Sequence, residues 1–471
     1  MMMNSIRKTV LCVVALLLLP KMANAAIVYD SEMSEILEEY DGVGLAAWSI
    51  DEDANVCSLG SAGERIKGSG EELKIAGNVR FHVGSITKSI TSTLIAVLIE
   101  DGAIESWNST LADLLPAEAS GTEYENVTIQ ELLGMMSGIP RDPTNFFSYE
   151  QETDDLLEQR RLATMDALRS TPESPPGTSD LYSNWGYVVA GYIIESLSGA
   201  LFEEVVIDRI FAPLGFDELE VSSSFYAPTS RRDPWGHSGL FQTPCDPTTD
   251  ERGCDLPKFM AAAGLFSGPI AAMSEFFAFH LACHNGNHTA PLLTQETCQY
   301  IHKPANASVS PYGFGWLFTK DERAAADGEE EGLVASNTGS NTVNLYQVSL
   351  AFDINRAVVS YTNQLQPLVQ TVNMTTDAQE TLINGTQDCS SPFTYNSGNE
   401  NQVDPFDGDD EVDDVNKDTD LEGVQGDNGD EPNTVNDDET GGETSSTWCL
   451  LPAASRPLIS AVAIIASFMY Y

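Results

Sequence analysis

Basic residues are scarce in this sequence. Its 471 residues include 23 Lys and Arg against 71 Asp and Glu, which gives a formal net charge of -48. A nucleic-acid-binding protein needs a basic face that neutralises phosphates, so this charge balance argues against such a partner. We therefore expect the protein to bind no nucleic acid.

Apolar runs as long as the roughly 20 residues of a membrane-spanning helix are also missing. Near the N-terminus, a basic pair at 7–8 precedes an apolar run at 10–19 and a small-residue site at 23–25. This order is typical of a secretory signal peptide, here residues 1–25, cut after Ala25. The apolar run is too short for a membrane anchor, so we expect an exported protein.

Basic and aromatic residues are nearly missing between 401 and 443, where 17 Asp or Glu stand against one basic residue, Lys417. Such a segment cannot bury enough apolar surface to offset its ordering entropy. Residues 396–445 are therefore predicted to be a disordered, self-repelling stalk. Carboxylates suit calcium, but their spacing does not match an EF-hand loop, so no calcium site is predicted.

The chain ends with small residues at 441–446, a short spacer and an apolar run at 458–471. This order is typical of a signal for a glycosylphosphatidylinositol (GPI) anchor, whose tail is removed. The run is too short to span a bilayer, and no basic flank follows it. We expect residues 446–471 to be a GPI signal, with attachment near Ser445, so that only a lipid holds the protein at the cell surface.

Residues 26–395 have the composition of a globular domain without internal repeats, and they hold six cysteines. An even set in an oxidising compartment predicts three disulfides. Six cysteines allow many connectivities, and we expect cysteines that are close in the chain to pair with each other. The predicted pairs are Cys245–Cys254, Cys283–Cys298 and Cys57–Cys389.

Six N-glycosylation sequons lie in the same region. Each is a weak signal alone, but together with the signal peptide they indicate an exported eukaryotic glycoprotein. Their asparagines are Asn108, Asn126, Asn287, Asn306, Asn373 and Asn384.

Alternating apolar residues predict strands at both ends of this domain, at 43–50, 312–318, 343–352 and 357–362. Helices are predicted between them, at 85–100, 187–198 and 273–283. The first of these helices is apolar on nearly every side, which is typical of a helix at the centre of a domain. This order predicts an α+β fold in which the chain-terminal segments share one antiparallel sheet, packed with helices, beside a mostly helical region.

The strongest local signal for chemistry is the segment 81–88, an extended stretch that enters the buried helix. Ser85 would stand at the helix N-terminus, where the positive end of the dipole faces its hydroxyl. Lys88 follows three residues later on the same face, and a neutral, desolvated lysine could take the serine proton. The Ser-x-x-Lys pattern alone is weak, because a chain of this length contains it by chance, as a serine cap beside a solvated lysine.

A second candidate segment is Tyr182-Ser183-Asn184, just before an apolar helix. Near Lys88 the anionic form of a phenol would be favoured, so Tyr182 is a candidate proton shuttle. The amide of Asn184 can both donate and accept hydrogen bonds. Taken alone, Tyr182 also fits a core aromatic residue, and only the order of the motifs favours the catalytic interpretation.

Four further segments complete a pattern of known type. Residues 132–140 resemble a Leu-Leu-Thr-His-Thr-Ser-Gly-Leu-Pro loop, 211–216 a Pro-Leu-Gly-Met turn, 263–267 a Gly-Gly-Leu-Phe-Ser segment and 312–316 a Tyr-Gly-Leu-Gly-Trp strand. In this order they are the segments of the serine β-lactamase, penicillin-binding-protein and D-alanyl-D-alanine carboxypeptidase superfamily. Over roughly residues 30–365 the chain resembles this superfamily, most closely its class C-like branch and the related esterases.

The resemblance implies a β-lactamase/transpeptidase-like fold and an acyl-enzyme on Ser85, without metal or cofactor. It implies that Lys88 and Tyr182 share the general base and acid roles, and that Asn184 holds the substrate amide. The substrate would be a small molecule or a peptide, and the bond cleaved an ester, an amide or a lactam.

The superfamily's third motif, Lys-Thr-Gly or His-x-Gly, aligns with Asn337-Thr338-Gly339. With the resemblance, these residues and Ser340 are expected to bind substrate, and the Ser340 N–H to join that of Ser85 as an oxyanion hole. Asn337 departs from the pattern, because lysine or histidine could attract a substrate carboxylate and asparagine offers only neutral hydrogen bonds. The alternative hypothesis is therefore a catalytically impaired β-lactamase-like binding module at the cell surface.

Two other patterns in the sequence could indicate a metal site or a different kind of serine hydrolase. His280, His284 and His288 recur every four residues, as metal ligands do, but a helix-breaking glycine and a sequon interrupt the series, so no zinc is predicted. A Ser-His-Asp hydrolase usually carries a Gly-x-Ser-x-Gly elbow, which this sequence lacks. His82 is accordingly predicted to be a half-buried strand residue.

Overall fold

The computed structural model of the chain describes residues 26–144, 146, 148–216, 233–246, 254–287, 292–321, 331–384 and 389. Most of the predicted globular domain is therefore described, whereas the predicted signal peptide, stalk and GPI signal lie outside the described residues. Across these ranges, no helix is both long and apolar enough to cross a lipid bilayer.

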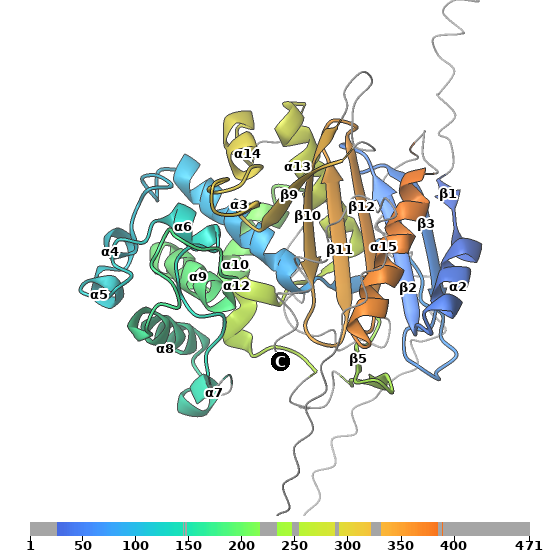
Figure 1. Ribbon diagram of the computed structural model, residues 1–471, viewed down its shortest axis with the longest axis horizontal. Coiled ribbons are helices and arrows are strands. Elements are labelled where there is room, and N and C mark those ends of the chain that lie inside the picture. Colours follow the sequence, from blue (N-terminus) through green and yellow to red (C-terminus); the bar gives the residue numbers. More distant parts are fainter. Residues whose placement is uncertain are drawn as a thin grey trace, which may run out of the picture. The chain divides into compact units, whose positions relative to one another are not determined.

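One eight-stranded sheet joins the two ends of the domain, in the order β1-β3-β2-β12-β11-β10-β9-β8 (Figure 1). Its N-terminal strands are β1 (Ile27–Val28), β2 (Gly44–Ile50) and β3 (Val56–Gly63). Its C-terminal strands are β8 (Tyr312–Gly313), β9 (Trp316–Asp321), β10 (Gly332–Gly339), β11 (Leu345–Ala351) and β12 (Arg356–Thr362). The two groups meet where β2 pairs antiparallel with β12, which confirms the predicted sheet of chain-terminal segments. The short β1 departs from the predicted antiparallel pairing, because it pairs parallel with β3.

Helices cover both faces of the sheet (Figure 1). Helices α2 (Asp30–Glu39) and α15 (Leu368–Asn384) lie on one face, where Leu45 and Ala47 of β2 pack in a small core with residues of both helices. The alternate residues of β2, such as Trp48, point into the main core on the other face. Because both faces are covered, every residue of β2 is buried.

The mostly helical region contains α3 (Thr87–Glu100), which follows a 3-10 turn at Gly84–Ile86. Its residues 87–98 are all buried, so this helix is at the centre of the domain, as predicted. The helices around it are α4 (Leu111–Leu114), α5 (Pro116–Ala119), α6 (Ile129–Leu133), α7 (Ser148–Glu152), α8 (Leu156–Arg169), α9 (Asn184–Ser198), α10 (Phe202–Val206), α12 (Ala261–Gly264), α13 (Ile270–Asn285) and α14 (Gln295–Ile301). Two small sheets, β4 (Arg80–His82) with β7 (Ser267–Pro269) and β5 (His237–Ser238) with β6 (Thr243–Pro244), complete the fold.

The segment 312–318, predicted as one strand, is instead a tight hairpin of β8 and β9. Phe314 and Gly315 turn the chain with positive φ angles of 54° and 88°. A Cβ atom on Gly315 would lie 2.5 Å from the backbone of Ser89, so only glycine lets this turn pack against α3. The single-strand prediction was wrong because it considered local alternation only.

All three predicted disulfides are present, as Cys57–Cys389, Cys245–Cys254 and Cys283–Cys298. The first closes the longest loop, because it joins the start of β3 to the segment after α15. The third joins α13 to α14.

Candidate active site

Ser85 lies in the turn between strand β4 and the central helix α3. Its side chain is almost fully buried, with 6% of the residue surface exposed. The turn depends on Gly84, which has a positive φ of 52° and whose added Cβ would lie 2.2 Å from the backbone nitrogen of Ser340. Glycine therefore allows strand β10 to approach the backbone just before Ser85.

Lys88 is one helical turn beyond Ser85 and is fully buried. Its Nζ lies 3.1 Å from Ser85 Oγ and donates to Asn184 Oδ1 at 2.7 Å and to the backbone oxygen of Ala263 at 2.6 Å. Burial holds the pKa of this amine well below its usual range, whereas the charge of Asp142 raises the pKa and that of Arg141 lowers it. The surroundings therefore favour the neutral amine that a base requires.

Tyr182 also contacts the candidate nucleophile, Ser85. Its hydroxyl lies 2.6 Å from Ser85 Oγ, and the Lys88 Nζ atom is 4.8 Å from its ring centre. Ser183, the next residue, caps helix α9: its Oγ accepts the N–H of Gly186 at 2.8 Å and donates to Pro140 O at 2.8 Å. This cap fixes Tyr182 between the start of α9 and the loop at 132–140.

Asn184, the first residue of α9, connects Lys88 to a charged pair that the sequence did not reveal. Its Nδ2 donates to Asp142 Oδ1 at 2.7 Å, and Asp142 Oδ2 accepts from Arg141 Nε at 3.1 Å. The only signal for this pair was its place directly after the loop at 132–140. The four predicted residues Ser85, Lys88, Tyr182 and Asn184 are thus brought together in one hydrogen-bonded group.

Strand β10 packs directly against the turn that holds Ser85. A Cβ atom on Gly339 would lie 1.9 Å from the oxygen of Val83 and 2.7 Å from the backbone nitrogen of Ser85. Two glycines, one on each side, therefore let the backbone around Ser85 and the backbone around Ser340 pack closely together. This is the arrangement that a two-donor oxyanion hole needs.

Asn337 has a different environment from the one that the sequence suggested. Its Nδ2 donates to Gly315 O at 2.7 Å and to Ser85 O at 3.3 Å, and only 8% of the residue is exposed. Its amide hydrogens therefore join strand β10 to the β8–β9 turn and to the first turn of the central helix, whereas a substrate-facing amide was expected. Thr338, which follows, is also buried.

His82 and Asp255 lie behind the candidate oxyanion hole. His82 Nδ1 accepts the N–H of Gly84 at 3.1 Å, and its Nε2 lies 3.2 Å from Asp255 Oδ1. The same oxygen accepts from Asn341 Nδ2, at 3.3 Å, one residue after Ser340. His82 is a strand residue, as predicted, although it is buried and not half-buried, and its contact with the turn was not predicted.

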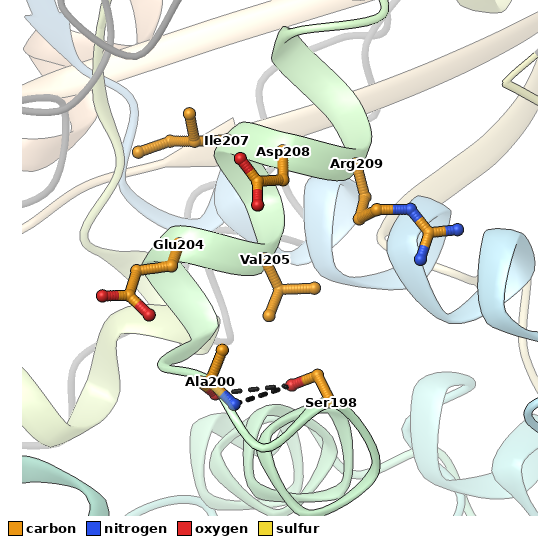
Figure 2. A pocket seen from close by; sticks show the side chains of 7 residues that line it. All are labelled: Ser198, Ala200, Glu204, Val205, Ile207, Asp208 and Arg209. Carbon is orange, nitrogen blue, oxygen red and sulfur yellow. Dashed lines mark hydrogen bonds between the residues drawn. The ribbon is translucent and has the colours of Figure 1, made fainter.

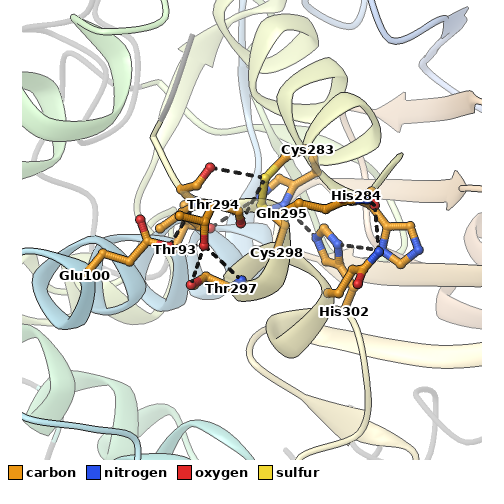
Figure 3. The surroundings of a disulfide bond; sticks show 12 residues. Thr93, Glu100, Cys283, His284, Thr294, Gln295, Thr297, Cys298 and His302 are labelled. Carbon is orange, nitrogen blue, oxygen red and sulfur yellow. Dashed lines mark hydrogen bonds between the residues drawn. A yellow bond between two sulfur atoms is a disulfide. The ribbon is translucent and has the colours of Figure 1, made fainter. Parts of the chain in front are cut away.

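Three histidines form a chain of ring contacts beside the Cys283–Cys298 disulfide, and two of them, His284 and His302, are labelled in Figure 3. His302 Nε2 lies 2.8 Å from His280 Nδ1, and His302 Nδ1 lies 3.1 Å from His284 Nδ1. The two ring nitrogens of His302 face different partners, so the three rings do not converge on one metal position. His302 was missed because it lies outside the four-residue series, and His288 lies outside the described residues.

A second group of potential metal ligands is also unsuitable for binding an ion. In the part of the chain that the structure describes, one group of ligand atoms does converge, from Asp51, Cys57 and Cys389. Those two cysteines are bonded to each other, so they offer no thiolate ligands.

A hollow of about 390 Å³ lies away from Ser85, at the C-terminal end of α9, opposite the end that carries Asn184 (Figure 2). Its one hydroxyl, Ser198 Oγ, contacts the backbone of Ala200. Its lining residues are Ser198, Ala200, Glu204, Val205, Ile207, Asp208 and Arg209. The contact of Ser198 is to backbone and not to a basic side chain, so the hollow offers no counterpart to the group around Ser85.

Comparison with known proteins points to one family. The sequence matches the family described as Beta-lactamase over residues 30–382. It is 34% identical to penicillin-binding protein 4 of Amycolatopsis lactamdurans over 29% of this chain and 35% of that protein. It is 23% identical to penicillin-binding protein 4* of Bacillus subtilis over 57% of each chain, and 28% identical to the unguisins hydrolase ungD' of Aspergillus campestris over 30% of this chain and 27% of that protein. The chain thus spans between 27% and 57% of the length of these relatives.

Solved structures share the fold. SurE superposes with a TM-score of 0.58 at 19% identity, over 75% of this chain and 74% of that chain. A class C β-lactamase of Rhodobacter sphaeroides superposes with a TM-score of 0.56 at 18% identity, over 74% of this chain and 97% of that one. The predicted α+β fold of β-lactamase type is confirmed.

Proposed function

The chain belongs to the beta-lactamase family, and we propose that it is a serine hydrolase that cleaves an ester, amide or lactam through an acyl-enzyme on Ser85. One observation carries the proposal: Ser85 Oγ lies 3.1 Å from the Lys88 amine and 2.6 Å from the Tyr182 hydroxyl. These are the contacts that activate a serine for attack on a carbonyl carbon. They also favour an enzyme over the alternative of an impaired binding module.

Acylation begins with removal of the Ser85 proton. A neutral Lys88 has two N–H groups and one lone pair, and the carbonyl oxygens of Asn184 and Ala263 take the two hydrogens. The lone pair is left for the hydroxyl of Ser85, whose oxygen then bonds to the substrate carbonyl carbon. The N–H groups of Ser85 and Ser340 stabilise the negative charge that develops on the carbonyl oxygen.

Release of the product needs the proton to move on. Tyr182, in contact with Ser85 Oγ, gives its hydroxyl proton to the leaving nitrogen or oxygen as the substrate bond breaks, and it takes up in return the proton that Lys88 holds. Water then adds to the acyl carbon, gives a proton back through the same groups, and Ser85 Oγ leaves as a hydroxyl. Lys88 and Tyr182 are assigned these steps jointly, because interacting groups titrate as a pair.

The substrate class follows from Asn337. Strand β10 offers no cation beside the nucleophile, and the amide hydrogens of Asn337 are bound to the backbone oxygens of Gly315 and Ser85. The preferred substrates are therefore small molecules or peptides without a free carboxylate next to the scissile bond, since an unpaired charge would be costly there.

The proposed location is the outer surface of the cell. Support comes from the signal-like N-terminus, from three disulfides, and from sequon asparagines on the surface. The exposed ones are Asn108, Asn126, Asn287 and Asn306. The proposed GPI anchor and acidic stalk lie outside the described residues and rest on sequence alone.

Two active-site probes test the function. The purified protein is treated with a fluorescent fluorophosphonate or a fluorescent penicillin, and its hydrolysis of simple esters is measured. We expect labelling and turnover in the wild type and in Ser198→Ala, whose hydroxyl lies in the distant hollow, and neither in Ser85→Ala. No labelling by either probe, together with no ester turnover, would contradict the proposal.

A further inference from the structure

Arg141 and Asp142 lie beside the predicted catalytic group without touching the nucleophile. The Arg141 Nε atom donates to Asp142 Oδ2 at 3.1 Å, and 25% and 11% of the two side chains are exposed. The backbone oxygen of Arg141 also accepts the N–H groups of Asn184 at 2.9 Å and Trp185 at 3.1 Å. The pair is therefore anchored to the first turn of helix α9.

Asp142 decides which end of the Asn184 amide faces Lys88. An asparagine amide can turn around, and its neighbours select one orientation. An ionised carboxylate only accepts hydrogen bonds, so the oxygen of Asp142, 2.7 Å away, must face Nδ2 of Asn184. Oδ1 of Asn184 must then face Lys88 Nζ, also at 2.7 Å.

The orientation of the Asn184 amide in turn orients the lysine. Ala263 O is a second fixed acceptor, 2.6 Å from Nζ. With both hydrogens of a neutral amine directed to these two oxygens, the lone pair points toward Ser85. An Asn184 amide turned around would present hydrogens to Lys88 and compete with Ser85 for the lone pair.

A carboxylate so close to Lys88 has an electrostatic cost. Its negative charge favours the protonated amine, which cannot act as a base, and the positive charge of Arg141 opposes this effect. The other polar groups close to Lys88 are hydroxyls, one side-chain amide and one backbone carbonyl. They are Ser85 on the turn before α3, Tyr182 and Tyr187 from the α9 region, Asn184, and the Ala263 oxygen of α12.

We propose that Arg141 and Asp142 are a positioning pair: Asp142 orients Asn184 and thereby Lys88, and Arg141 offsets the charge of Asp142. This inference rests on the function proposed above. It assigns to the loop after residue 140 a part in setting the pH range in which the enzyme works.

The test is the dependence of kcat/KM on pH for a nitrophenyl ester. Activity rises with pH as Lys88 loses its proton, so the acidic limb of the profile reports that step. Removing a positive charge in Arg141→Gln moves the limb to higher pH. Removing a negative charge in Asp142→Asn moves it to lower pH, while the new amide oxygen still accepts from Asn184. The sign is the same if Tyr182 takes the proton, because a nearby cation favours the deprotonated form of either group.

One unit below the wild-type midpoint, we expect Arg141→Gln to be slower and Asp142→Asn faster than the wild type, each by at least about threefold. In Asp142→Ala, which loses the orienting oxygen, kcat falls at every pH. The matched control is Glu71→Gln, which breaks the ion pair of Glu71 with Arg65 at a distance from the site and leaves the limb in place.

A merely structural role would lower activity without moving the two limbs in opposite directions. Unchanged limbs, or limbs that move the same way in Arg141→Gln and Asp142→Asn, overturn the inference while wild-type turnover upholds the proposed function. A wild type that hydrolyses no ester at any pH overturns both. Melting temperatures of the variants show whether each one is folded.

Discussion

A lysine amine acts as a base only when it is neutral, and its surroundings decide this property for Lys88. Burial lowers its pKa well below the usual range, because water no longer stabilises the charged form. Two carbonyl oxygens then direct its hydrogens away from Ser85. A single buried position thus accounts for both the basicity and the direction of the proposed base.

Asn337 is the residue whose replacement should change specificity. Asn337 itself does not face the substrate, but the longer side chain of Asn337→Lys would bring a cation close to Ser85. The ratio of kcat/KM for a carboxylate-bearing ester over its amide-capped analogue should then rise at least about tenfold. Loss of the bonds to Gly315 and Ser85 should cost about 1–3 kcal/mol of unfolding free energy.

Asn337→Ala is the control for this change, since it loses the same bonds without adding a charge. Specificity measured by steady-state kinetics and stability measured by urea unfolding separate the two effects. An unchanged specificity ratio in a folded, active Asn337→Lys would show that this position does not select the substrate charge.

The residues of the candidate site differ in how far sequence could predict them. Ser85 and Lys88 lie one turn apart in one segment, and Tyr182 and Asn184 lie at the start of helix α9. Each pattern alone is weak, and the order of these and the other superfamily-like segments along the chain identified them. Asp142 could not be predicted, because its role depends on how a loop meets helix α9 in three dimensions.

At the level of elements, the contact between β10 and the nucleophile turn controls the candidate oxyanion hole. In Gly339→Ala, the new methyl group would lie 1.9 Å from Val83 O, so strand and turn must separate. We expect acylation of Ser85 by a fluorophosphonate to slow by about 100-fold or more, because an oxyanion donor is displaced. Stopped-flow labelling measures this rate.

Gly121→Ala is the matched control for Gly339→Ala. Gly121 has a positive φ of 79° and no atom within 4 Å of an added Cβ, so alanine strains the backbone without touching the site. This variant should lose about 1 kcal/mol of stability and keep the wild-type acylation rate. Equal acylation rates in both variants would mean that close packing of β10 is not needed.

Helices and strands could be predicted from sequence only where their pattern of apolar residues is long. Long apolar patterns predicted the strands at 43–50, 343–352 and 357–362 and the central helix, because burial on both faces leaves a strong signal. The hairpin at 312–318 was missed because its turn is set by contact between Gly315 and Ser89, far apart in sequence. Such a contact leaves no local pattern.

Across the whole molecule, a buried histidine chain makes stability depend on pH. Burial lowers the pKa of His280 to about 3 and lowers those of His284 and His302 as well. Below about pH 6.5 the unfolded chain binds protons at these histidines that the folded protein does not, so stability falls as pH decreases. The slope is at most about 1.4 kcal/mol per pH unit for each histidine.

We therefore expect the melting temperature to fall between pH 7 and pH 5.5, and to fall less in His302→Gln, which removes one of the titrating rings. Differential scanning calorimetry at the two pH values measures the difference. The variant starts from a lower stability at pH 7, because His280 and His284 each lose a ring partner. The same pH dependence in both proteins would rule out this source of acid sensitivity.

The shared sheet and the disulfide pairing could be predicted from sequence, whereas contacts between the buried histidines could not. The shared sheet and the three disulfides followed from the order of strands and cysteines along the chain. The histidine chain did not, because His302 reaches His280 and His284 only after α14 packs on α13. Figure 3 shows His302 beside His284.

Acylation of Ser85 is tested most directly by the mass of the intact protein during reaction with a penicillin or an activated ester, followed by peptide mapping. We expect one added acyl group on the peptide that contains Ser85, formed faster as pH rises through the acidic limb and absent from Ser85→Ala. An acyl group on another residue, or an adduct that persists in Ser85→Ala, would contradict this expectation.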